Sequence, residues 1–251
     1  MSESKKTKWA SVARLPMMAA ATTLVAVGSL AVPTAAHAAT SATPTASAAP
    51  SRAASATHSE TDAGYGALQT EGLASASATI TVPRGSCGSS TAALQFGVFA
   101  GHGFSSIDLS CATGSPVYTY DLDTPAEPIV EPAAFGDTVV TMLFETSQVI
   151  QAEVHDLTNG QYWVDSTDEA GTDTGAIFGL ASNDPAPIPS FAKTTFKSLQ
   201  MNGDNIGFYG DDQQGEALTQ LNLVPDRHTL VSTSGLSANG TSFVATFKQA
   251  E

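Results

Sequence analysis

A strict alternation of apolar and polar residues in the run IQAEVHD is the feature that most constrains the fold. Ile150, Ala152 and Val154 fall on one side of an extended chain, and the polar residues between them fall on the other. The tripeptide Thr-Asn-Gly at 158–160 then suits a tight turn into the following run, QYWV. This pattern predicts a β-hairpin with one buried face.

Similar short β-rich runs recur along the chain, and helical periodicity is nearly absent after residue 70. About a dozen such runs, separated by turn residues, favour an all-β antiparallel sandwich of two sheets. Besides the hairpin, the expected strands are 76–82, 92–99, 105–111, 116–122, 138–145, 175–180, 191–199, 217–224, 229–233 and 242–248.

The first 38 residues have the pattern of a secretory signal peptide. Four basic residues precede an uncharged, largely apolar run at 15–32, and Ala36-His37-Ala38 satisfies the small-x-small cleavage rule. The alternative is an uncleaved membrane anchor, but Gly28 and Pro33 weaken the run as a spanning helix. We therefore expect a secreted, extracellular protein.

Residues 39–65 are mostly Ala, Ser and Thr with scattered Pro. Such a segment has too little large apolar surface to offset the entropy of ordering it, so we expect a disordered linker. The remaining residues, 66–251, are enough for one domain with a sizeable core.

The charge balance excludes several classes of partner. Without residues 1–38 the chain has six basic and 23 acidic side chains, a net charge of −17. A field of this sign repels nucleic acid and anionic lipid, so we expect no nucleic-acid partner and no membrane association after signal cleavage. Nothing in the sequence indicates an oligomeric state.

Cys87 and Cys111 are the only cysteines. In an exported chain such a pair favours a disulfide, and two free thiols are the alternative. A metal site there is disfavoured because His102 is the only histidine close to them in sequence.

No established catalytic or metal-binding pattern stands out. The expected exported part lacks the G-x-S-x-G pattern of serine hydrolases. His102, His155 and His228 remain as possible bases, but His102 lies in a flexible turn and His155 on the polar side of a strand. The stretch 165–173 contains four carboxylates but lacks the residue order of a calcium loop, so it is either a calcium site or, as we favour, a solvated acidic loop. We expect no metal and no cofactor.

A set of motifs in residues 66–251 resembles the glutamic peptidases, or eqolisins, in their bacterial secreted form. The motifs occur in family order, and the last is the most specific: ASASATITVP, FGVFAG, VYTYDLDTPAEP, FGDTVVTMLFE, AEVHDLTNGQYW, FAKTTFKSLQMNG and HTLVSTSG followed by GTSFVATF. The resemblance implies a jelly-roll, concanavalin-like sandwich of the eqolisin type.

The resemblance also implies a metal-free acid endopeptidase site. In the family, a Glu activates the attacking water and a Gln stabilises the oxyanion, both projecting from one sheet face into a groove lined by aromatic residues. The Glu comes from a strand of the form Ala-Glu-x-Ile-x-Glu, which matches GAIFGLA here. Its base position falls on Leu180 and its earlier Glu on Ala176.

The Gln position has two alternatives. It falls on Leu109, with Asp108 beside it, if FGVFAG marks the preceding strand; in a rival alignment it falls on Gln95 in LQFG. Fewer of the family's groove aromatics are present here, since the family's Trp falls on Phe96 in one motif and on Thr119 in the other. The other groove candidates are Tyr118, Tyr120 and Asp121, although cross-strand packing would equally explain the tyrosines.

These observations favour a family homologue that has lost catalysis, because leucine can neither accept a proton nor donate to an oxyanion. Such a protein would bind an extended peptide or a glycan in the groove. The first alternative is an active acid endopeptidase in which Asp108, Asp121 or Asp184 replaces the glutamate. The second alternative is an unrelated carbohydrate-binding sandwich.

Overall fold

The computed structural model describes residues 56–70, 72–124, 128–182, 187–210, 217–225 and 228–248. The predicted signal peptide, the first part of the predicted linker and Asp184 lie outside the described residues. The described chain is all-β apart from one short 3-10 helix, η1 (Ile206–Gly210). In this part of the chain no helix is long and apolar enough to cross a membrane.

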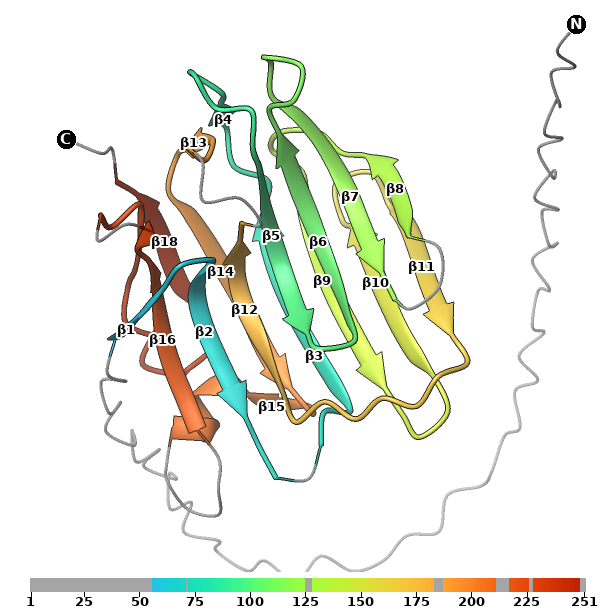
Figure 1. Cartoon of the computed structure of the whole chain (residues 1–251). Coiled ribbons are helices and arrows are strands. Elements are labelled where there is room, and N and C mark those ends of the chain that lie inside the picture. Colours follow the sequence, from blue (N-terminus) through green and yellow to red (C-terminus); the bar gives the residue numbers. More distant parts are fainter. Residues whose placement is uncertain are drawn as a thin grey trace, which may run out of the picture. The chain divides into compact units, whose positions relative to one another are not determined.

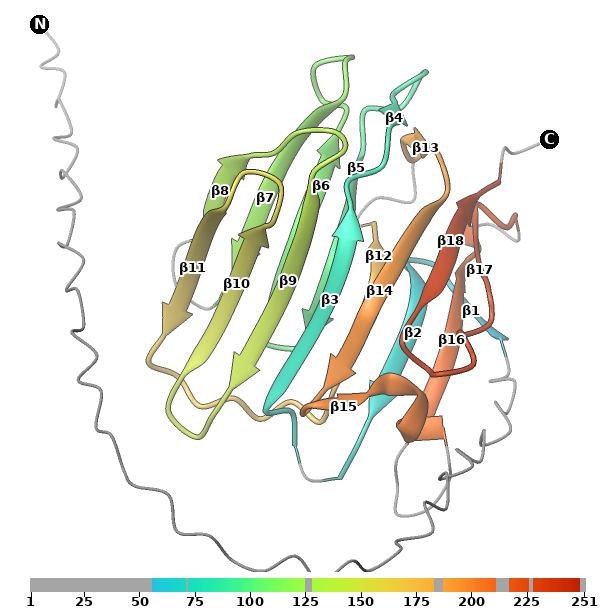
Figure 2. The same cartoon turned by 180° about the vertical axis from the view of Figure 1, so that it is seen from behind.

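The strands form two layers that are joined along one side by the pairing of β16 with β17 (Figures 1 and 2). The front layer of Figure 1 contains, in spatial order, β16 (Ala217–Leu223), β2 (Asp62–Leu68), β12 (Gly175–Ala181), β5 (Ala93–Ala100), β6 (Gly103–Ser110), β7 (Val117–Asp123) and β8 (Ile129–Pro132). The other layer, nearer the viewer in Figure 2, contains β11 (Gln161–Thr167), β10 (Ile150–Asp156), β9 (Thr138–Glu145), β3 (Ser75–Thr81), β14 (Thr194–Met201), β18 (Phe243–Phe247) and β17 (Val231–Thr233).

Four short strands complete the fold. β1 (Ala56–Ser59) runs parallel to β16, and every other strand pair is antiparallel. β15 (Asp204–Asn205) pairs with β14. β4 (Gly85–Ser86) and β13 (Ser190–Phe191) form a separate two-stranded sheet.

Each strand expected from the sequence corresponds to a strand of the structure, which confirms the all-β fold class. Ile150, Ala152 and Val154 are buried as the alternation predicts. The hairpin from β10 to β11 turns at 157–160, where Gly160 has a φ of +74° that suits glycine.

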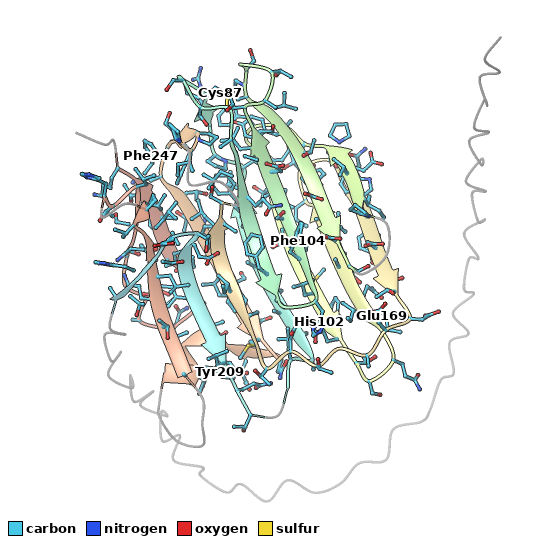
Figure 3. All side chains as sticks on the ribbon, viewed as in Figure 1. Cys87, His102, Phe104, Glu169, Tyr209 and Phe247 are labelled. Carbon is cyan, nitrogen blue, oxygen red and sulfur yellow. A yellow bond between two sulfur atoms is a disulfide. The ribbon has the colours of Figure 1, made fainter. Side chains whose placement is uncertain are left out.

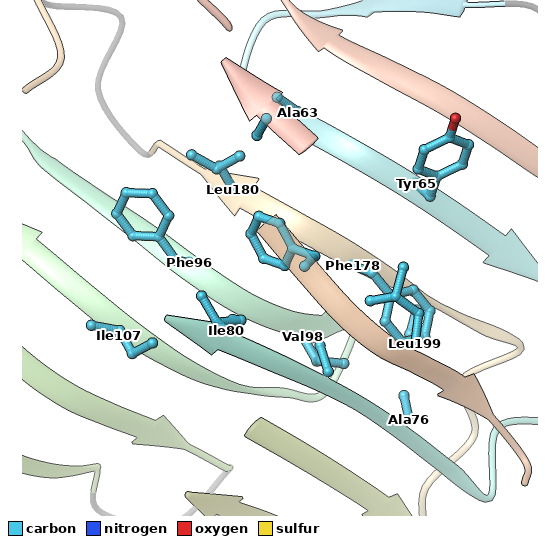
Figure 4. Close-up of a cluster of buried hydrophobic side chains, with 14 of the residues drawn as sticks. Ala63, Tyr65, Ala76, Ile80, Phe96, Val98, Ile107, Phe178, Leu180 and Leu199 are labelled. Carbon is cyan, nitrogen blue, oxygen red and sulfur yellow. The ribbon is translucent and has the colours of Figure 1, made fainter. Parts of the chain in front are cut away.

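The core lies between the two layers, where alternate side chains of facing strands meet. Figure 4 shows part of it: Phe96, Phe178 and Leu180 of the front layer pack in one cluster with Ile80 and Leu199 of the other. Burial of such large apolar side chains is the main stabilising contribution to a sandwich of this kind.

Two described strands lie partly or wholly before the expected boundary between linker and domain at residues 65 and 66. Among the described residues the first strand, β1, starts at Ala56, and β2 lies between β12 and β16 inside the front layer. Ala63, Tyr65 and Ala67 are buried there, while glycines occupy the alternate positions. A strand built from small residues and one tyrosine lacks the bulky apolar alternation by which strands are recognised in sequence.

The predicted disulfide is present. Cys87 and Cys111 are bonded, with their Cα atoms 5.4 Å apart, and they join the loop after β4 to the end of β6. No other cysteine exists in the chain.

Candidate functional site

Leu109 and Leu180, the two positions that the resemblance assigns to catalysis, point into the core. Both side chains are 0% exposed. Leu180 lies between Phe96 on β5 and Ala63 on β2, as Figure 4 shows. Neither leucine therefore shares a face with residues that meet solvent, and an ionised group at either position would be buried among apolar side chains.

The outer face of the same strands contains a cluster of polar side chains. On β5, Leu94 and Phe96 are buried, and Gln95 between them faces outwards. Its direct neighbour across β6 is Asp108, which is only half-buried. On β7 the direct neighbour of Asp108 is Thr119, and Asp121 lies two residues further along on the same face, between the buried Tyr120 and Leu122.

Gln95, Asp108 and Asp121 converge above β6. The Gln95 amide Nε2 donates a hydrogen bond of 3.3 Å to Asp121 Oδ2, although these two residues lie on strands on either side of β6. Asp108 projects from the strand between them, and its Oδ1 is buried with no hydrogen-bond partner among the described residues. Gln95 and Asp108 are direct cross-strand neighbours. Asp121 pairs with Ser106, two residues from Asp108 along β6, so it joins the cluster diagonally through its hydrogen bond with Gln95.

Burial perturbs both carboxyl groups of this cluster. Desolvation, together with the charge of Asp121, raises the pKa of Asp108 to about 6. The pKa of Asp121 is also raised, by burial and by the charge of Asp123, but the hydrogen bond from Gln95 acts in the opposite direction. In mildly acidic solution Asp108 therefore holds its proton.

A row of glycines crosses the sheet one step further along the same face. Gly97 on β5, Gly179 on β12 and Gly64 on β2 are direct cross-strand neighbours. A Cβ atom on Gly179 would clash with the backbone carbonyl oxygen of Ala63, and one on Gly97 would lie 2.7 Å from the Cα of Ser106. Neighbouring backbones therefore approach too closely at these glycines for any side chain to fit. Gln95 and Asp108 lie next to this row of glycines.

The aromatic groove candidates lie on the opposite face from Asp121. Phe96 is fully buried with its ring 5.3 Å from that of Phe191. The hydroxyl of Tyr120 donates to Asp156 Oδ2 at 2.7 Å inside the sandwich. The Tyr118 hydroxyl accepts a hydrogen bond from the backbone N–H of Gly85. All three side chains point inward, because positions 96, 118 and 120 share the inward parity of their strands.

The acidic stretch 165–173 does not gather its carboxylates around one point. Asp165 accepts hydrogen bonds from the backbone and side chain of Thr124, and Asp173 contacts His102. Asp168 and Glu169 are exposed. The stretch is therefore not a single calcium loop.

The two other candidate histidines lie away from the Gln95 cluster. His155, on the outer side of β10, contacts Glu153, with Nε2 3.1 Å from Oε2. His228 is exposed. β10, which carries His155, belongs to the other layer from Gln95, and His228 lies in the connection from β16 to β17 at the joined side of the two layers.

Ala181 is the residue of β12 that the sheet register places beside Gln95. It is the direct neighbour of Gln95 across β12 and it lies on the same face, whereas Leu180 faces the core. The alternation along β12 could have indicated this: Phe178 and Leu180 are buried, so the odd-numbered positions of this strand lie on the outer face with Gln95. On this face β12 contributes no carboxylate.

Comparison with solved structures shows which fold this is. The described layers match the structure of scytalido-glutamic peptidase with a peptide-based transition state analogue, with a TM-score of 0.58 and 18% identity, over 75% of this chain and 99% of that chain. They also match SCP-B, a member of the eqolisin family of peptidases, in a complex with the tripeptide Ala-Ile-His, with a TM-score of 0.56 and 21% identity over the same shares.

The chain has the glutamic peptidase fold. This confirms the predicted eqolisin-type sandwich. Neither the family models nor the curated protein sequences give a match to this chain. At this level of identity the likeness establishes the glutamic peptidase fold, and the chemistry has to be argued from the side chains.

Proposed function

We propose that this protein is a peptide hydrolase that acts in acidic solution through Gln95, Asp108 and Asp121. The observation that carries the proposal is their convergence on the outer face of the glutamic peptidase fold. Two proteins of this fold bind a peptide-based transition state analogue and a tripeptide, respectively. Secretion, as predicted from residues 1–38, is part of the proposal, and the disulfide is compatible with it.

The different surroundings of the two carboxyls define their roles. Asp121, which accepts the Gln95 hydrogen bond, is the base that takes a proton from the attacking water. Asp108, whose pKa is about 6, keeps its proton and gives it to the amine as the C–N bond breaks. The Gln95 amide N–H donates to the oxyanion that forms on the carbonyl oxygen. A water molecule is added across the peptide bond, and no metal enters these steps.

Peptide or glycan binding without catalysis is the second candidate. It is favoured by Ala181, since the strand that provides the family's glutamate offers only a methyl group opposite Gln95. In this case the polar cluster would hold an extended chain by hydrogen bonds and the backbone would not be cleaved.

Cleavage of unfolded casein between pH 2 and 7 separates the two candidates. We expect acid-dependent cleavage by the wild type, reduced about 100-fold or more in Asp121→Asn, Asp108→Asn and Gln95→Leu, because each removes a proton-transfer or oxyanion group. Asp168→Asn, on the exposed acidic stretch, is the matched control and should leave the rate unchanged. A wild type that binds casein without cleaving it would support the binding protein. Cleavage unaffected by all three site variants would exclude this site.

A pair of adjacent substitutions tests which residue of β12 faces the site. Ala181→Glu puts a carboxylate opposite Gln95 and should remain folded with equal or greater activity. Leu180→Glu puts a charge into the core and should cost several kcal/mol of stability at neutral pH. Thermal unfolding and the casein assay report both effects. If Leu180→Glu is folded and more active while Ala181→Glu has no activity, then Leu180, and not Ala181, faces the site.

A further inference from the structure

Three potential metal ligands from three separate elements meet at the end of the sandwich opposite Cys87 (Figure 3). His102 lies in the turn between β5 and β6 of the front layer, and Glu145 is the last residue of β9 in the other layer. Asp173 lies in the connection from β11 to β12. One ligand atom from each residue lies within 4.8 Å of the others.

Hydrogen bonds hold Asp173 at the centre of this cluster. Its Oδ1 is 2.8 Å from His102 Nδ1, and its Oδ2 accepts the backbone N–H of His102 at 2.9 Å. The backbone N–H of Asp173 donates to Glu145 Oε2 at 3.2 Å. The Asp173 carbonyl also accepts the backbone N–H of Leu73 at 2.6 Å. The cluster is therefore positioned by backbone contacts as well as by side chains.

Glu145 shows that these contacts leave the cluster incomplete. The residue is 3% exposed, and its Oε1 is buried without a hydrogen-bond partner among the described residues. A buried carboxylate oxygen without a partner is costly, and such groups are normally paired or bound to a cation. The two carboxylate side chains pack directly against glycines, since a Cβ on Gly101 would lie only 2.6 Å from Asp173 Oδ1 and a Cβ on Gly171 would overlap the Glu145 side chain.

We infer that His102, Glu145 and Asp173 bind a first-row divalent transition-metal ion of the Zn²⁺ type. One imidazole nitrogen and two carboxylate oxygens are a donor set that suits Zn²⁺, with a fourth position left for water. An oxygen-only site would instead favour Ca²⁺ or Mg²⁺. The bound ion would link the β5–β6 turn of one layer to β9 of the other. The three ligands lie on different loops and strand ends from Gln95, Asp108 and Asp121. Loss of metal binding and loss of peptidase activity can therefore be distinguished.

The test is titration of the chelator-treated protein with ZnCl₂ at pH 7.5, followed by calorimetry and thermal unfolding. We expect one saturable site per chain and a rise in Tm of roughly 5–10 °C at a hundredfold excess over Kd. His102→Ala and Glu145→Gln should each weaken binding about tenfold or more, because each removes one ligand. Co²⁺ should show d–d absorption bands of a low-coordinate site that are absent in His102→Ala.

Two controls separate a built site from general attraction of cations to an acidic protein. His228→Ala removes an exposed histidine outside the cluster and should leave Zn²⁺ binding unchanged. Mg²⁺ should give no comparable rise in Tm. Absence of saturable Zn²⁺ binding, equal binding by His102→Ala, or an equal effect of Mg²⁺ would each overturn the inference.

Discussion

At the scale of single residues, one position in a strand separates a core side chain from a site side chain. Leu180 is packed between Phe96 and Ala63, whereas Ala181 faces the same surface as Gln95. The same parity separates Leu109 from Asp108 on β6. Because side chains alternate strictly along a strand, a shift of one residue in a sequence comparison exchanges the two faces completely.

Asp108 also leads to a prediction about stability and pH. Its pKa is about 6 in the folded protein, above the ordinary value of 3.8. Between these pH values the folded chain holds a proton that the unfolded chain releases. The contribution of Asp108 to the free energy of unfolding is therefore complete below about pH 4 and is lost as the pH rises through 6. Asp108→Asn keeps the neutral form, and it should raise the free energy of unfolding at pH 7.5 by about 1–2 kcal/mol, less than the full shift implies because the group is half exposed.

Urea unfolding of wild type and variant at pH 4 and pH 7.5 measures this difference. At pH 4 the two proteins should differ little. An equal difference at both pH values would show that the Asp108 carboxyl titrates normally.

At the scale of secondary-structure elements, glycines let β2, β12 and β5 approach closely beneath the site. Gly64, Gly179 and Gly97 occupy one row across these strands, and each lies too close to a neighbouring backbone for a Cβ. Glycine usually weakens a strand, but here it allows the backbones of neighbouring strands to approach closely. The row ends beside Ser106 and Asp121, so it shapes the surface on which the polar cluster stands.

Gly179→Ala should therefore destabilise the protein by about 2 kcal/mol or more, because the new methyl group forces the β2 and β12 backbones apart. Gly66→Ala is the matched control. It lies on β2 with nothing within 4 Å of its added Cβ, and it should change stability little. Equal effects of the two substitutions in thermal unfolding would show that the close approach does not matter.

At the scale of the whole molecule, covalent and polar links lie at opposite ends of the sandwich. Cys87 and Cys111 tie the loop after β4 to the end of β6, and His102, Glu145 and Asp173 connect the two layers at the other end (Figure 3). The apolar core occupies the space between them. Such links are useful at the ends, where loops contribute little apolar burial.

Replacing both cysteines with serine should lower the free energy of unfolding by roughly 3 kcal/mol, because the unfolded chain regains the entropy of an open 24-residue loop. Denaturation with and without a reducing agent measures it. The serine variant should not respond to the reducing agent. If the wild type also does not respond, the disulfide adds no stability.

The sequence by itself determined the strands, the fold class and the disulfide, because these follow from local patterns. Two-residue periodicity marks each strand, and turn residues separate the strands. When a chain has only two cysteines and is expected to be exported, each cysteine has one obvious partner. Even the likeness to the glutamic peptidase fold was readable from the order of short motifs. The small-residue strand β2 escaped, since Gly and Ala lack the side chains that make the alternation visible.

Only the tertiary structure decided which residues act together. Gln95, Asp108 and Asp121 lie on three neighbouring strands and meet through one cross-strand pair and one diagonal hydrogen bond, neither of which a local pattern specifies. His102 and Asp173 are 71 positions apart in sequence and come from loops that meet only when the two layers pack. A site of this kind depends on distances between segments, whereas a strand depends only on its own residues. For that reason the sequence sufficed for the fold, and the positions of the candidate sites required the folded chain.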